Sequence, residues 1–170
     1  QRSASLSGIS SFKGVRYWYS SFRTHLPKNQ ELLEAIIQLD EAYFGGWRGQ
    51  TLLMAKQKGT RKLAYQILPP TAPTRTDAID FVKAYIKPGS TLCTDGYSIY
   101  TGIDQFHPVR HEVDIHKAWE YSRTSEIEGV FGNLRTFIRR MYHHTTTAKL
   151  SEIVSEFCFR FSHPEMFKNP

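Results

Sequence analysis

Hydrophobic and polar residues along the chain follow two spacings, one typical of strands and one typical of helices. Strand-like runs bounded by turn residues predict five strands, at residues 36–44, 51–57, 61–69, 90–95 and 108–114. Helical spacing predicts helices at residues 12–24, 126–141 and 148–161, one through Ile79, Val82 and Ile86, and short segments at 30–35 and 97–105. Three successive strands followed by alternating helices and strands predict an α/β fold, with one mixed sheet and helices on its faces.

Length and composition indicate one compact domain preceded by an N-terminal extension. The chain has 170 residues, 40% of them hydrophobic, and no apolar run is long enough to span a membrane. We expect residues 31–170 to form the domain and residues 1–30 to form a tail and a helix. That helix either packs on the domain, which we favour slightly, or ends a DNA-binding module removed by trimming, since the chain begins at Gln1.

Cys93 and Cys158 lie far apart in apolar runs, which favours buried thiols in a reducing cytosol. The net charge of the chain is +6. A basic protein suits a polyanionic partner, because each phosphate that Lys or Arg neutralises releases counterions. Simple solubility explains the same charge, so the charge alone favours nucleic acid only modestly.

Two aspartates stand in strands that are otherwise apolar. Asp40 lies in "IIQLDEAYFGG" and shares a strand face with Gln38 and Ala42. An ionised acid there is costly unless something pairs with it. Asp95 ends the buried run "STLCTD", and strand ends at a sheet edge are common positions for metal ligands. The alternatives are a salt bridge from Asp40 to an arginine and an N-cap role for Asp95.

A third acid lies in the helical segment "SEIEGVFGNLRTFIRRMYHH". Glu128, Gly132, Arg135 and Arg139 follow one another at steps of four, three and four beside the core stripe. Gly132 costs about 1 kcal/mol relative to Ala, and close approach of a DNA backbone is one reason to tolerate it. An ordinary surface face of Glu and Arg is the alternative. Glu126 lies on a different stripe, and the Gly/Arg pattern favours Glu128.

Three clustered acids repel one another unless cations neutralise them. Hard oxygen ligands with open positions suit Mg²⁺ or Mn²⁺. Two such ions can activate a hydroxyl and stabilise the leaving oxygen of an in-line phosphodiester displacement. Asp40 would then lie inside an apolar strand because it is a metal ligand.

Four motifs resemble the catalytic domains of bacterial insertion-sequence transposases, in the ISXO-like branch related to the eukaryotic Merlin elements. They are "LDEAYFGG", "TDGYSIY", "IEGVFGNLR" and "YHHTTTAKLSEIVSEFCFRF", in the family's order from about Ile36 to Phe161. The chain departs from the family at Ser125, where relatives commonly have Asn, and at Phe131, where they have Trp.

The resemblance implies a ribonuclease-H-like fold with a five-stranded mixed sheet, and a DDE triad of Asp40, Asp95 and Glu128 that binds two Mg²⁺ or Mn²⁺ ions. It implies cleavage at terminal inverted repeats and transfer of the 3′-hydroxyl to target DNA, by a homo-oligomer on DNA in the bacterial cytoplasm. Arg135 falls where such enzymes carry a DNA-contacting cation. The full set of expected DNA contacts is Trp47, Arg48, Arg135, Arg139, Arg140, His143 and His144.

Two other functions stay open at this point. A nuclease or resolvase on the same fold would keep the acids and cut DNA without joining ends. A domesticated, non-catalytic DNA-binding protein would use the same acids only structurally. Product analysis and metal titration separate these functions from transposition.

Overall fold

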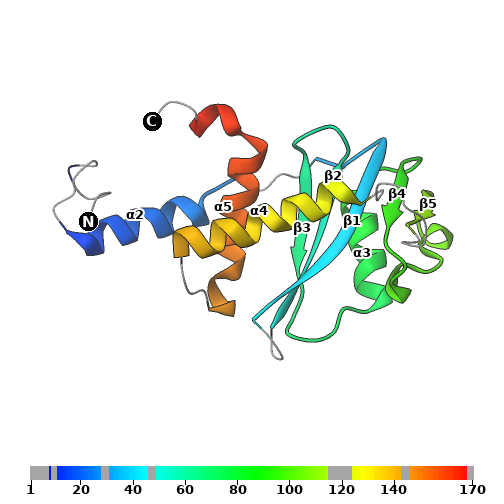
Figure 1. The fold of residues 1–170 in the computed structure, drawn as a ribbon, viewed down its shortest axis with the longest axis horizontal. Helices are drawn as coiled ribbons and strands as arrows, with labels where there is room; N and C mark the ends of the chain where they lie inside the picture. Colours follow the sequence, from blue (N-terminus) through cyan, green and yellow to red (C-terminus); the bar gives the residue numbers. More distant parts are fainter. Residues whose placement is uncertain are drawn as a thin grey trace.

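A five-stranded sheet forms the centre of the molecule (Figure 1). Its strands are β1 (Ile36–Phe44), β2 (Gln50–Gln57), β3 (Leu63–Ile67), β4 (Thr91–Thr94) and β5 (Arg110–Val113). They lie in the order β3-β2-β1-β4-β5; β1, β2 and β3 pair antiparallel, whereas β4 pairs parallel with both β1 and β5. The structure is a computed structural model that describes residues 8, 11–27, 31–45, 49–114, 124–142 and 146–167.

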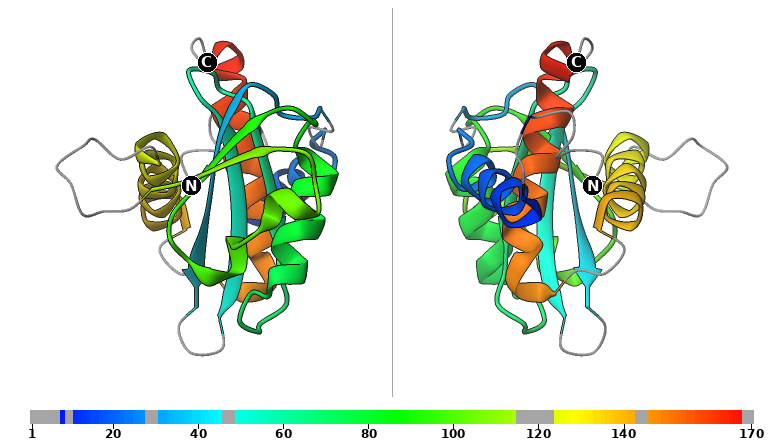
Figure 2. Two further views of the ribbon diagram at one scale, coloured as in Figure 1. Left: turned by 90° about the vertical axis from the view of Figure 1, so that its right-hand side faces the viewer. Right: turned by 90° about the vertical axis from the view of Figure 1, so that its left-hand side faces the viewer.

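Helices cover both faces of the sheet, as the sequence predicts. They are α2 (Phe12–Thr24), α3 (Arg75–Tyr85), α4 (Ser125–Tyr142) and α5 (Thr147–Ser162), with short 3-10 turns η2 (Ser98–Tyr100), η3 (Ile103–Gln105) and η4 (Pro164–Phe167). Figure 2 shows α3 on one side of the strands and α4 on the other. Among the described residues, no helix has the length and apolar character needed to cross a membrane.

Side-chain alternation along β1 divides the core into two clusters. Ile37 and Leu39 pack with α3, whereas Ala42 packs with α4 and α5. Cys93 and Cys158 are buried free thiols, as expected. Thr74 begins α3 through a capping box with Asp77.

Two predicted helical segments are wrong. Leu33 is extended rather than helical, because its backbone N–H and C=O pair with Tyr85 and Lys87 at 2.8 Å each. Those bonds join the segment before β1 to the end of α3. The expected helix at 97–105 is instead η2 and η3, because Gly102 lies between them with a left-handed φ of 68° and ends the helical path.

Helix α2 forms as predicted and packs on α5. Phe22 meets Phe159 edge-on, with ring centroids 6.4 Å apart. Arg23 donates to Glu156 at 2.7 Å, and the Glu156 side chain is 1% exposed. Arg160 also pairs with Glu156, and the hydroxyl of Tyr142 at the end of α4 donates to it. This buried carboxylate therefore joins α2, α4 and α5, although α2 itself has no buried residue.

Candidate active site

Asp40 and Asp95 meet at the carboxyl end of β4. The parallel register pairs Ile36 with Thr91 and Gln38 with Cys93, and the same offset brings Asp40 level with Asp95. One carboxylate oxygen from each of Asp40, Glu41 and Asp95 lies within 4.8 Å of the others. In the part of the chain that the structure describes, this is the group of acids that could hold a metal ion.

Backbone amides orient both aspartates. The N–H of Glu41 donates to Oδ1 of Asp40 at 2.8 Å, and the N–H of Tyr97 donates to Oδ1 of Asp95 at 3.0 Å. Asp95 thus holds the turn before η2 rather than capping that helix, whose N-cap is Tyr97 without a side-chain hydrogen bond, and Asp95 also faces Asp40. Each side chain is fixed through one oxygen, so its second oxygen can face a cation.

Contacts from the sheet hold the first turn of α4 above β1. Gln38 is buried, and its Oε1 accepts a hydrogen bond from the N–H of Ile127 at 2.9 Å. Lys56 on β2 is also buried and forms an ion pair with Glu126. Glu126 is therefore tied to the sheet, whereas the negative charge of Glu128 acts on Asp40 and raises the pKa of that carboxyl. The two glutamates thus have different surroundings. Of the three acids expected to converge, the structure brings Asp40 and Asp95 together, whereas Glu128 is exposed on α4 and is not part of the acid cluster.

The acids lie in an environment that disfavours their ionised forms. Burial raises the pKa of Asp40 to about 6, and the charges of Asp95 and Glu128 add to the effect, while the Glu41 N–H and Arg135 oppose it. Burial and the charges of Asp40 and Asp95 also raise the pKa of Glu41 to about 7, against a hydrogen bond from Tyr100 that lowers it. A cluster with this excess of negative charge fits a divalent cation.

Glu41 is the member of the cluster that reasoning from the sequence did not assign. Neighbouring residues on a strand point to opposite faces, so strand alternation gives no reason for Asp40 and Glu41 to share a site. However, β1 pairs with β4 only from Ile36 to Gln38, and beyond that point both side chains lie at an edge that β4 does not cover. In the sequence, the feature that could have pointed to Glu41 is its place directly after Asp40, near the end of an apolar strand.

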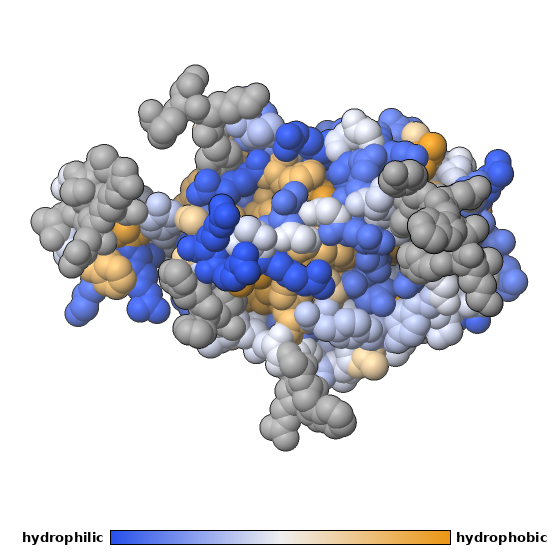
Figure 3. All heavy atoms as spheres, in the orientation of Figure 1, coloured by the Kyte–Doolittle hydropathy of each residue, from blue (hydrophilic) through white to orange (hydrophobic). Residues whose placement is uncertain are grey.

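The arginines expected to contact DNA lie along α4. Arg135, Arg139 and Arg140 are all exposed, and a Cβ built on Gly132 has no neighbour within 4 Å. Figure 3 shows hydrophilic side chains over α4 with hydrophobic ones around them. The other four candidates, Trp47, Arg48, His143 and His144, lie outside the described residues.

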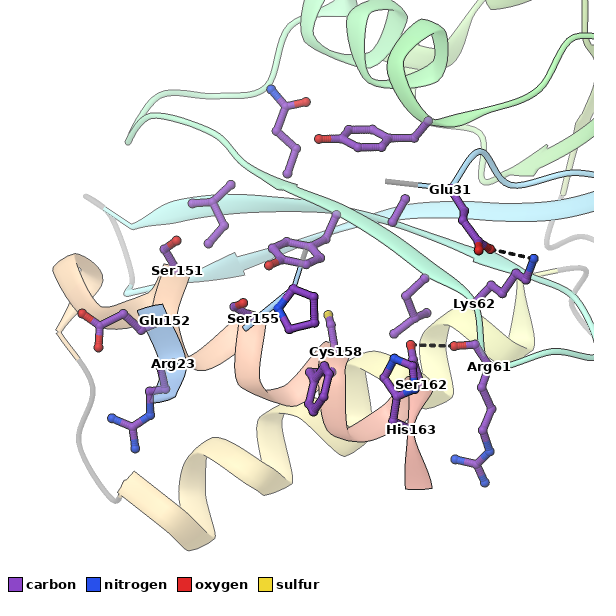
Figure 4. Close-up of a pocket in the computed structure, with 18 of the residues that line it drawn as sticks. Arg23, Glu31, Arg61, Lys62, Ser151, Glu152, Ser155, Cys158, Ser162 and His163 are labelled. Carbon is purple, nitrogen blue, oxygen red and sulfur yellow. Dashed lines mark hydrogen bonds and ion pairs between the residues drawn. The ribbon is translucent and has the colours of Figure 1, made fainter. Parts of the chain in front are cut away.

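A separate cleft of about 1290 Å³ lies between β3, α5 and the end of α2 (Figure 4). Its walls include Arg23, Glu31, Lys62 and Cys158, and an ion pair of 2.9 Å joins Lys62 to Glu31. The acid cluster is not part of its lining. The acid cluster at the end of β4 is therefore a site separate from this cleft.

Two solved structures that share the fold of this chain come from a retroviral intasome and a retroviral integrase. A chain of the simian T-cell lymphotropic virus intasome, solved with PP2A regulatory subunit B56 gamma, matches at 14% identity and a TM-score of 0.56, over 80% of this chain and 50% of that one. The catalytic core domain of BIV integrase matches at 12% identity and a TM-score of 0.52, over 75% and 82%. The chain thus spans half the length of the intasome chain and has the ribonuclease-H-like fold of integrase catalytic cores.

The fold and the strand-end acids define the class of ribonuclease-H-like DNA-processing domains. Residues 32–162 match the ISXO2-like transposase domain, and the chain belongs to that family of DDE transposases. No curated protein matches the chain in sequence. The resemblance of the motifs and the expected fold are both confirmed.

Proposed function

We propose that this transposase domain cleaves DNA at transposon ends and joins the freed 3′-hydroxyl to target DNA, with Asp40, Asp95 and Glu128 as its catalytic acids. The observation that carries the proposal is the meeting of Asp40 and Asp95 at the end of β4. Glu128 is assigned from the motif order. The terminal inverted repeats of the element are the proposed substrate.

The donor set suits Mg²⁺ or Mn²⁺, since it consists of carboxylates whose pKa values are raised by burial and by one another's charges. Two bound ions would supply electrophilic stabilisation of the phosphate and of the leaving oxygen. The chain's own part is to fix the ligands: backbone amides hold Asp40 and Asp95, and the anchored first turn of α4 presents Glu128. Because strands and a helix carry these groups, their separation is set before substrate binds.

Arg135 and Arg139 are proposed to bind the phosphates next to the reacting one. They follow Glu128 by seven and eleven residues, which corresponds to about 10 Å and about 16 Å along a helix. Substrate DNA that enters at the acids can therefore follow α4 toward Arg139 and Arg140. We assign Trp47, Arg48, His143 and His144 to the same DNA surface on the strength of the motif order alone.

Residues 1–30 are proposed to add a second DNA contact through α2. Lys13 and Arg16 are exposed on this helix, which contains no acidic residue. Exposed cations without nearby acids on the same helix suit a phosphate backbone. We further propose a homo-oligomer on paired DNA ends, acting on the nucleoid of a bacterial cell.

Strand transfer of pre-cut inverted-repeat ends, with Mg²⁺ or Mn²⁺, tests the assignment. Asp40→Asn, Asp95→Asn and Glu128→Gln should each abolish joining, because each removes a proposed ligand. Asp80→Asn is the control, since it removes one negative charge from an exposed position on α3 and should leave joining at the wild-type level. Full activity in a triad variant refutes that residue's role, and DNA hydrolysis without joined product indicates a nuclease.

A further inference from the structure

Glu41 is the acid of the cluster that the catalytic assignment leaves unused. We propose that Glu41 is a fourth carboxylate ligand of the divalent cation site and that Tyr100 positions it. This inference rests on the function proposed above, and it adds a residue to the same site.

The path of β1 places Glu41 at the site. Asp40 and Glu41 leave the strand on opposite faces, since Gln38 and Asp40 face α4 while Glu41 reaches Tyr100 in the core beneath α3. Even so, their carboxylate oxygens and that of Asp95 lie within 4.8 Å of one another. A cation at this edge is therefore reached from both faces of β1.

Tyr100 fixes the Glu41 carboxylate. Its hydroxyl donates to Oε2 of Glu41 at 2.6 Å, and Tyr100 is 1% exposed. Its ring also meets the ring of Tyr97 edge-on at 6.4 Å, and the N–H of Tyr97 binds Asp95. The segment from Tyr97 to Tyr100 thus orients two acids of the cluster. Residues that hydrogen-bond to metal ligands commonly orient them in this way.

The competing explanation is that Glu41 only braces β1 against η2. Glu41→Gln separates the two roles, because an amide oxygen can still accept the hydrogen bond from Tyr100 while it loses the charge that attracts a cation. Glu41→Asp separates a ligand from a mere nearby charge. This substitution keeps the carboxylate but shortens the side chain by one methylene. If Glu41 binds the cation directly, the shorter side chain no longer reaches it and affinity falls. If Glu41 acts only as a nearby negative charge, affinity stays the same.

The experiment is a Mn²⁺ titration of the whole chain by calorimetry and by electron paramagnetic resonance, with urea unfolding to verify the fold of each variant. Glu41→Gln and Glu41→Asp should each weaken Mn²⁺ binding about tenfold or more, as Asp40→Asn should. Tyr100→Phe should weaken it less, because the carboxylate remains but loses its orientation. Glu112→Gln should leave the Mn²⁺ affinity unchanged, because it removes an acid from β5, which lies two strands away from β1 in the sheet.

With folded Glu41 variants, two results overturn the inference and leave the proposed function intact. One is wild-type Mn²⁺ affinity in both Glu41 variants while Asp40→Asn binds weakly. The other is weak binding in Glu41→Gln with wild-type binding in Glu41→Asp, which reduces Glu41 to a nearby charge. Unchanged binding in Asp40→Asn refutes the metal site itself. If the Glu41 variants do not fold, wild-type affinity in Tyr100→Phe contradicts the positioning role and overturns the inference.

Discussion

The metal-free protein is expected to lose stability as the pH rises through the range in which the acid cluster ionises. The pKa of Asp40 is raised from 3.8 to about 6, and that of Glu41 from 4.5 to about 7. The folded state therefore binds these protons more tightly than the unfolded chain does. The stability that these two groups contribute is complete below about pH 4, falls as the pH rises through the two folded-state pKa values, and changes no further above about pH 8.

The size of the effect follows from the two shifts. One pKa unit corresponds to about 1.4 kcal/mol, so the Asp40 shift taken alone corresponds to about 3 kcal/mol. Both carboxyls are partly exposed to water, which screens the interaction, and they share one mutual repulsion. We therefore expect the pair together to lower the free energy of unfolding by about 2 kcal/mol between pH 4.5 and pH 7.5. Saturating Mg²⁺ at pH 7.5 should restore it.

Urea unfolding in EDTA at a series of pH values measures this loss. Other groups titrate in the same range, so the informative quantity is the difference between the wild type and Asp40→Asn. That variant should become more stable relative to the wild type as the pH rises, because it lacks the charge that the cluster repels. Glu112→Gln should follow the wild type. Parallel curves for the wild type and Asp40→Asn would refute the electrostatic reasoning.

Three further outcomes are expected. Glu156→Gln should lower the free energy of unfolding by about 3 kcal/mol in urea titrations, because two arginines lose a buried counter-ion; a loss under 1 kcal/mol would contradict this. Gly132→Ala and Gly129→Ala should both stabilise the protein by about 1 kcal/mol, since neither added Cβ has a neighbour within 4 Å. Only Gly132→Ala should weaken DNA binding, and equal affinities would remove the reason proposed for that glycine. Lys13→Ala combined with Arg16→Ala should reduce the slope of log affinity against log salt by about 2; an unchanged slope would exclude α2 from the DNA surface.

Much of the fold could be predicted because its elements have clear local signals. The five strands are short apolar runs between turn residues, and all five occur in the structure close to the expected positions. Helix α4 carries its core residues at helical spacing, and Ile127, Phe131 and Leu134 are buried. Asp40 and Asp95 could be chosen because a charged residue at the end of an apolar strand is unusual without a partner.

The remaining features depend on contacts between distant segments. Leu33 is extended because it pairs with residues beside Ile86. The difference between Glu126 and Glu128 depends on Lys56, which is 70 residues from Glu126. Glu41 joins the cluster because β4 is shorter than β1, and strand length is the least certain part of a sequence-based assignment.

The two kinds of anchoring in the site have different consequences for catalysis. Asp40 and Asp95 are held by the register of β1 with β4, which many buried side chains support. Glu128 depends on the placement of the first turn of α4, and Gln38 holds that turn through one buried hydrogen bond to Ile127. Removal of this bond would leave a buried N–H without its partner and free the helix end to shift. Gln38, although it contacts no substrate in our proposal, therefore helps to place the turn of α4 that carries Glu128.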